Sequence, residues 1–356
     1  MEFIDELIDK NNISSFIRKT TYKNHEYIFI NGKLIFKKII KQTKFLKKII
    51  QSSFINNHFI TMDLETRTID GIMKPYAVSI YDGENINSFY LLDYNNPDDM
   101  VYNAIKSIML HKYKNYKVYL HNLSHFDSIF TIKTLSLLSN KTIKPIVRDG
   151  RIIEFKFTFN NLNENISIYF RDSYLLLPSS LKELAFNFNV ENKGIFPYKF
   201  VKNENIPLDY IGAIPSIESF DKVTREEYLN YCNKYKNKWN LREETLKYCN
   251  QDVITLHQVI STFQIKIFNL FRVDIIKSPT LSSLAFAIFR SNYLKDHKIP
   301  LINGEIYNFI KKGYTGGSVD VYKPSPKAGE KINRYDINYL YPFAMKEFYM
   351  PVGNPQ

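Results

Sequence analysis

The chain has 356 residues, of which 44% are hydrophobic, and a formal net charge of +12. This composition predicts a folded protein with sizeable cores and excludes an intrinsically disordered chain. A basic chain with 26 Tyr and 27 Phe favours a nucleic-acid partner, because Lys and Arg bind phosphates and rings stack on bases. The abundant Ile, Asn, Lys, Tyr and Phe all have AT-rich codons, which explains much of this excess without any function.

The two cysteines, Cys232 and Cys249, are too few and too isolated for a zinc site or a disulfide framework, and they fit a reducing compartment. No apolar run reaches the length of a membrane-spanning helix, so no membrane partner is expected. The first ten residues are acidic and resemble neither a signal peptide nor an Arg-rich transit peptide. We therefore expect a protein that is cytosolic or made inside the organelle where it works.

Residues 1–57 form a basic extension whose role the sequence does not define. Residues 26–30 and 33–36 flank Asn31-Gly32, a dipeptide typical of a type I′ hairpin turn. A lysine-rich run at roughly helical spacing follows, and it could bind phosphates or form a solvated helix face. Its members are Lys37, Lys38, Lys41, Lys44, Lys47 and Lys48.

From residue 58 onward the pattern alternates between strands and helices. Strands are predicted at residues 58–64, 76–81, 88–92, 116–121, 151–159 and 166–170. Helices are predicted at residues 103–110, from 127 to about 138, from the capping box Thr224-Arg-Glu-Glu227, and at 242–271. This order indicates an α/β fold with a mixed sheet.

Two acids on the first of these strands are the starting point for function. Asp63 and Glu65 are one residue apart, so the alternation of a strand places both on one face. Two carboxylates on a half-buried face repel each other and are costly to desolvate unless cations lie between them. Taken alone, a solvated strand end explains the pair more simply.

Further acids change this balance. Asp127 begins a helix directly after a strand, and Asp252 lies on the apolar stripe of a long helix, one turn after Tyr248. Four acids that converge from distant segments suit a phosphodiester-cleaving site with two Mg²⁺ or Mn²⁺ ions. One ion would activate a water, the other would stabilise the leaving 3′ oxygen, and Tyr248 would hold the attacking water.

Three segments resemble the exonuclease motifs of family B DNA polymerases in residue type, spacing and order. They are Asp63-x-Glu65, Asn122-x-x-x-Phe126-Asp127 and Tyr248-x-x-x-Asp252. The resemblance implies a ribonuclease-H-like 3′-5′ exonuclease domain over residues 58–272, which removes mismatched 3′ ends of DNA.

The resemblance continues through residues 273–356, as a linker and the beginning of a polymerase palm. Tyr314-x-Gly316-Gly317 resembles the Y-x-G-G loop, which contacts the template backbone. Asp336 and Tyr341 lie in a segment similar to polymerase motif A. They would bind catalytic Mg²⁺ and the incoming dNTP, with Tyr341 stacked under the sugar.

Other residues resemble the protein-primed branch of the family, found in phages and on linear plasmids of fungal mitochondria. Lys182-Glu-Leu-Ala185 is similar to a motif whose lysine stabilises the scissile phosphate, although a solvated helix lysine is nearly as good an interpretation. Thr66, Asn122 and Phe126 match positions that hold the single-stranded 3′ end. The implied partners are template-primer DNA, dNTPs and a terminal priming protein. The implied location is the mitochondrion, or alternatively phage-infected or plasmid-bearing cytoplasm.

The resemblance predicts a DNA-directed DNA polymerase acting in DNA replication, with a proofreading exonuclease. The sequence ends before the motif that carries the second palm aspartate, so polymerisation is expected to need a missing C-terminal part. A non-catalytic DNA-binding remnant of a broken plasmid gene is the alternative, and the presence of all four acids with Tyr248 argues against it. A free-standing exonuclease would leave the Y-x-G-G-like segment unexplained.

The 356-residue chain alone is therefore expected to shorten a primer without extending it. Losing one electrostatic stabiliser costs about 10²–10³ in rate, and an aspartate-bearing strand is lacking here. A primer-extension gel with all dNTPs, run beside a lane without them, measures this. Products longer than the input primer would contradict the interpretation.

Overall fold

In the computed structural model, two compact units are present, Lys48–Lys295 and a second made of Met1–Lys47 with Asp296–Gln356. The structure describes residues 17–22, 25–30, 33–39, 44–136, 142–161, 164–191, 194–221, 223–235, 238–296, 299–314, 320, 325, 327, 329–331, 333, 335 and 337–350.

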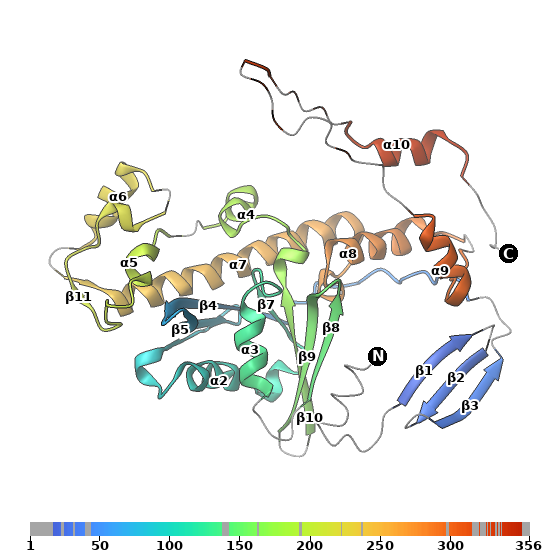
Figure 1. Cartoon of the computed structure of the whole chain (residues 1–356), viewed down its shortest axis with the longest axis horizontal. Helices are drawn as coiled ribbons and strands as arrows, with labels where there is room; N and C mark the ends of the chain where they lie inside the picture. The colour runs from blue at the N-terminus through green and yellow to red at the C-terminus, as the bar shows by residue number, and fades with distance from the viewer. Residues whose placement is uncertain are drawn as a thin grey trace. The chain divides into compact units, whose positions relative to one another are not determined.

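The larger unit is built on a seven-stranded sheet in the order β6-β5-β4-β7-β10-β9-β8 (Figure 1). The strands are β4 (Phe59–Ile69), β5 (Ile72–Tyr81), β6 (Ile86–Tyr90), β7 (Lys117–Leu120), β8 (Thr142–Arg148), β9 (Arg151–Asn161) and β10 (Glu164–Asp172). β7 pairs in parallel with both β4 and β10, whereas the remaining pairs are antiparallel. The sheet is thus mixed, and the predicted α/β fold class is confirmed.

Parallel pairing brings the carboxyl ends of three strands to one edge. Thr61 of β4 is paired with Tyr119 of β7, and Asp172 of β10 is paired with Leu120. Asp63 therefore lies just beyond the last residues of β7, at the level of the end of β10. In open α/β sheets this edge is where ligands usually bind.

Helices cover both faces of the sheet in the larger unit (Figure 1). The helices of this unit are α2 (Pro97–Ser107), α3 (Asp127–Ser136), α4 (Leu181–Phe188), α5 (Tyr198–Lys202), α6 (Arg225–Cys232), α7 (Leu241–Phe271) and α8 (Leu281–Ile288). Of these, α2 and α3 pack on one face of the sheet and α7 packs on the other. Ile60, Met62 and Leu64 of β4 lie in the same buried cluster as apolar residues of α2. Phe59 points to the other face, where it lies in a cluster with residues of α7.

The long helix α7 follows the predicted pattern closely. Asn240 caps its first turn by accepting from the backbone N–H groups of Arg242 and Glu243, and it ends where Arg272 adopts a left-handed conformation. The predicted capping box is also confirmed, because Thr224 and Glu227 exchange side-chain and backbone hydrogen bonds at the start of α6. Local capping chemistry thus sets both helix starts.

Two elements differ from the predictions. α2 begins earlier than residue 103, because Asn96 caps it through the backbone N–H of Asp99 and Pro97 occupies its first position. β8 was not predicted, since its side chains are mostly exposed and lack the alternation that identifies a strand.

The smaller unit contains a three-stranded antiparallel sheet and two helices. They are β1 (Ile17–Tyr22), β2 (His25–Ile30), β3 (Lys33–Ile39), α9 (Gly304–Lys312) and α10 (Leu340–Glu347). The pairing of Ile30 with Lys33 confirms the predicted hairpin. The helical reading of the lysine run is wrong: Lys37 and Lys38 belong to β3, and residues 44–50 are not helical.

Within the described part of the chain, no helix combines the length and the apolar character needed to cross a membrane. The unit Lys48–Lys295 contains the whole of the predicted exonuclease domain, residues 58–272, with flanking residues on both sides. The functional domain boundaries stay a prediction.

His257 of α7 makes the stability of the larger unit sensitive to acid. Its ring stacks on Phe59 at 4.4 Å and meets Tyr81 at 5.0 Å, and burial lowers its pKa from 6.5 to about 4. The unfolded chain binds this proton more readily, so the stabilisation is complete above pH ~6.5 and is lost as the pH falls toward 4.

We expect the parent to lose on the order of 3 kcal/mol more than His257→Phe between these limits, because the phenyl ring cannot be protonated. Urea denaturation of both proteins at several pH values measures the difference. Equal losses in the two proteins would contradict the assignment.

Candidate active site

Strand alternation and one hydrogen bond place two acids under helix α7. The Thr61 hydroxyl donates to the Val253 carbonyl at 2.7 Å, which joins β4 to α7 on the face that the odd-numbered residues share. Asp63 and Glu65 follow on that face; Glu65 is buried and Asp63 is partly exposed. The predicted arrangement of the two carboxylates on one face is thus present.

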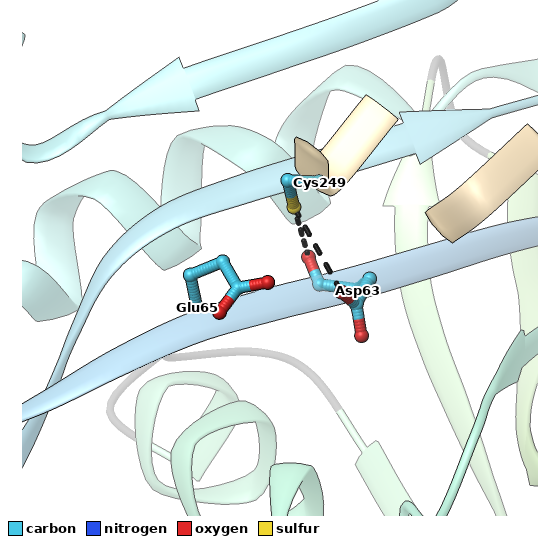
Figure 2. A group of neighbouring side chains, drawn as sticks. All are labelled: Asp63, Glu65 and Cys249. Atoms are coloured by element: carbon cyan, nitrogen blue, oxygen red, sulfur yellow. Dashed lines mark hydrogen bonds between the residues drawn. The ribbon is translucent and has the colours of Figure 1, made fainter. Parts of the chain in front are cut away.

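Helix α7 supplies three side chains to the same region. Tyr248, Cys249 and Asp252 are all buried on it. The Cys249 thiol donates to the Asp63 backbone carbonyl at 3.6 Å, and its Sγ lies 3.9 Å from Asp63 Oδ2. Figure 2 shows the Cys249 side chain pointing from α7 toward Asp63, with the Glu65 carboxylate beside them. The helix and the strand therefore present their polar groups to each other.

The fourth acid is positioned by a loop that another aspartate holds. Asp127 is the first residue of α3 and is buried. Asp172, fully buried at the end of β10, accepts hydrogen bonds from the backbone N–H groups of Asn122 and Ser124 at 2.9 and 2.8 Å. Asn122 has a φ of 73°, in the left-handed region that Asn tolerates better than most residues. The β7–α3 loop is thus fixed to the neighbouring strand.

The electrostatics show that these acids share one region. Burial raises the pKa of Asp127 well above its ordinary value, and the nearby Asp63 and Asp172 carboxylates raise it further. Burial likewise raises the pKa of the Cys249 thiol, with contributions from Asp63, Glu65 and Asp252. Each of these groups is less stable when charged, so a cation bound among them would be strongly favoured.

A pair of tyrosines lies beside the acids. The Tyr198 hydroxyl donates to the Tyr248 hydroxyl at 2.6 Å, and Phe196 stacks on the Tyr248 ring at 5.0 Å. Burial raises the pKa of Tyr198 above its ordinary value, and Glu65, Asp252 and Asp63 raise it further. Tyr248 is thus the acceptor in this pair, and its own proton points away from Tyr198.

Sequence reasoning missed Asp172, Tyr198 and the contact of Cys249. Asp172 ends a strand like many unremarkable acids, and Tyr198 follows an irregular segment without periodicity. Cys249 contacts a residue 186 positions away in the chain. A single sequence carries little signal for such long-range contacts.

The donor set fits divalent metal ions. Carboxylate oxygens are the ligands that Mg²⁺ and Mn²⁺ prefer. Among the described residues, Asp63, Glu65 and Cys249 offer ligand atoms that all lie within 4.8 Å of one another. Asp127 and Asp252 are the further buried acids of the region.

The residues expected to hold a single strand lie next to these acids in the chain. Thr66 is half-buried directly after Glu65, where the pairing of β4 with β5 shifts register. Asn122 and Phe126 flank the loop before Asp127, and Phe126 meets Phe130 edge-on at 5.7 Å. Their contact with DNA stays a prediction.

The remaining predicted site residues lie on α4, in the smaller unit or outside the described residues. Lys182 is exposed on α4. Hydrogen bonds from Thr224 lower the pKa of Glu227 on α6, and the Lys182 charge adds a smaller contribution. Gly316, Gly317 and Asp336 lie outside the described residues. Tyr314 and Tyr341 are exposed in the smaller unit. The roles predicted for them all stay untested.

Comparison with known proteins assigns the family. Residues 107–356 match the family described as DNA polymerase type B, organellar and viral. A probable DNA polymerase of Neurospora intermedia is 41% identical, over 99% of this chain and 39% of the relative. A probable DNA polymerase of Ascobolus immersus is 38% identical, over 99% and 30%. The DNA-directed DNA polymerase of Enterobacteria phage PRD1 is 23% identical, over 80% and 38%.

The chain belongs to the family of type B DNA polymerases of organelles and viruses. It spans 30% to 39% of the length of the two fungal relatives. Among solved structures it is similar to Phi29 DNA polymerase complexed with single-stranded DNA, with 19% identity, a TM-score of 0.37, and coverage of 58% of this chain and 31% of that one.

Asp172→Asn should destabilise the loop that carries Asp127. Asp172 Oδ1 accepts from Asn122 and Tyr174, and Oδ2 accepts from Ser124, so an amide would place an NH₂ group against a backbone donor. Hydrogen bonds to charged groups contribute about 1.5–3 kcal/mol, and we expect a loss of that size in the free energy of unfolding.

Asp149→Asn is the matched control, because the Asp149 side chain is 91% exposed. Its effect should stay within about 0.5 kcal/mol. Chemical denaturation measures the free energy of unfolding of both variants. Losses of the same size in this free energy would show that the buried hydrogen bonds of Asp172 do not stabilise the protein.

Proposed function

We propose that the larger unit is the 3′-5′ exonuclease of a type B DNA polymerase and hydrolyses phosphodiester bonds at single-stranded 3′ ends. One observation carries the proposal: Asp63 and Glu65 lie on one strand face, opposite Tyr248 and Asp252 of α7, and the Asp63 carboxylate acts electrostatically on Asp127. Family membership supports the assignment.

Asp63, Glu65, Asp127 and Asp252 would hold two Mg²⁺ or Mn²⁺ ions. When bound, such ions lower the pKa of a water and stabilise negative charge on the leaving 3′ oxygen. The four carboxylates would fix the positions at which the ions bind, because anionic side chains by themselves repel a phosphate. Glu65, Asp127 and Asp252 are buried, so electrostatic attraction within the site is strong.

Tyr248 would position the attacking water. Its hydroxyl oxygen already accepts from Tyr198, so the remaining proton is directed away from Tyr198. The Tyr198 hydroxyl and the stacked Phe196 ring hold the Tyr248 phenol in one orientation. Keeping a water at a fixed angle to phosphorus contributes to rate through orientation alone.

We propose that the whole protein, of which this chain matches a part, is a DNA-directed DNA polymerase. Its substrates would be dNTPs, and its partner would be a terminal priming protein. Family membership supports DNA synthesis, while the protein-primed resemblance motivates the priming partner. We also infer a mitochondrial location, from the AT-rich codons and the likeness to linear-plasmid polymerases. Subcellular fractionation with an antibody to the chain tests the location.

The exonuclease assignment predicts metal-dependent degradation of a 3′-labelled single strand. Asp63→Ala/Glu65→Ala should lower the single-turnover rate by at least about 10³, since more than one electrostatic stabiliser is lost. Glu84→Ala/Glu226→Ala is the matched control, because it removes the same charge from two exposed positions. The control should degrade the strand at the parental rate.

Equal rates for the parent and the Asp63→Ala/Glu65→Ala variant would disprove the site assignment. A parent that neither degrades the strand nor binds Mn²⁺ would instead favour the non-catalytic remnant.

A further inference from the structure

Cys249 places a sulfur atom beside the carboxylates of Asp63 and Glu65. Hydrolysis with Mg²⁺ does not require this sulfur atom. Its Sγ and the carboxylates of Asp63 and Glu65 come from two elements, α7 and β4, and lie within 4.8 Å of one another (Figure 2). Magnesium has little affinity for sulfur, whereas zinc binds thiolates and carboxylates together. The Cys249 sulfur is therefore a ligand that an oxygen-preferring ion such as Mg²⁺ would not use.

The spacing suits a four-coordinate ion. Zinc–sulfur and zinc–oxygen bonds of about 2.3 and 2.0 Å place tetrahedral S and O ligands roughly 3.5 Å apart. Sγ of Cys249 lies 3.9 Å from Oδ2 of Asp63, so this pair needs a shift of only a few tenths of an ångström, and the ligand atoms of all three residues lie within 4.8 Å of one another. Three protein ligands with one open position are the usual coordination of an accessible zinc ion. Asp63 is partly exposed, which gives the ion a route from solvent.

We propose that Asp63, Glu65 and Cys249 form a binding site for a thiophilic divalent cation, namely Zn²⁺. On binding, a sulfur–zinc bond forms and the thiol proton leaves to solvent. The site itself rests on the geometry of the three residues.

Its regulatory consequence rests on the proposed exonuclease function. A zinc ion held by sulfur occupies the carboxylates that Mg²⁺ needs, in a tetrahedral rather than an octahedral arrangement. Zinc should thus inhibit hydrolysis at a fixed Mg²⁺ concentration, and Cys249→Ser should need at least about tenfold more zinc for the same inhibition.

The binding test uses the full chain with Cys232→Ser as the parent, so that Cys249 is the sole thiol. Cys232 lies half-buried on α6, outside the cluster. Titration with Cd²⁺, a thiophilic probe, is followed by the ultraviolet charge-transfer absorption of the cadmium–thiolate bond, and Zn²⁺ is then added as a competitor. The comparison variants are Cys249→Ser and Asp63→Asn/Glu65→Gln, each checked for folding by circular dichroism.

The proposal predicts saturation at one Cd²⁺ per chain, displacement by Zn²⁺, no band in Cys249→Ser, and an affinity at least about tenfold weaker in Asp63→Asn/Glu65→Gln. An absent band in the folded parent would overturn the site. So would a band of unchanged affinity without the two carboxylates. The measurement involves no DNA, so its failure beside a working exonuclease rejects the zinc site alone. A cadmium band in a chain without nuclease activity would reject only the proposed function.

Discussion

Repulsion among buried carboxylates is the constraint on which the rest of the site depends. Asp127 lies near Asp63 and Asp172, and the Tyr198 phenol lies near Glu65, Asp252 and Asp63, in a region largely closed to water. Desolvated like charges are unstable together, so the protein stores free energy that a divalent cation can release. The proposed metal affinity and the cost of folding without metal thus have a common origin.

The order and direction of the strands in the sheet bring these carboxylates close together. Parallel pairing of β4, β7 and β10 brings their ends together, while the hydrogen bond from Thr61 to Val253 fixes which face of β4 meets α7. The Asp172 carboxylate is stabilised by hydrogen bonds rather than by a cation, since it accepts from backbone N–H groups. Its charge supports a loop, whereas Asp63 and Glu65 lie with Cys249 in a group whose ligand atoms could hold an ion.

The sequence alone predicted the parts that depend on local periodicity. Alternation placed Asp63 and Glu65 on one face, and the apolar stripe of α7 placed Asp252 inward. It could not predict contacts between remote segments, such as Cys249 with Asp63. The helix predicted for the lysine-rich run was wrong for a related reason. The spacing of the lysines alone suggested a helix, but pairing with β2 makes Lys37 and Lys38 part of a strand. Tertiary pairing overrides local preference in such cases.

The most direct test of the central claim is thermal unfolding with and without Mn²⁺ in the parent and in Asp127→Asn. The variant removes one of the repelling charges at nearly constant volume, so without metal it should unfold at the same temperature as the parent or higher. Saturating Mn²⁺ should raise the unfolding temperature of the parent, by a free energy of about 4 kcal/mol at 1,000 times the dissociation constant, and that of the variant much less. A parent insensitive to Mn²⁺, or a variant stabilised equally, would contradict the account.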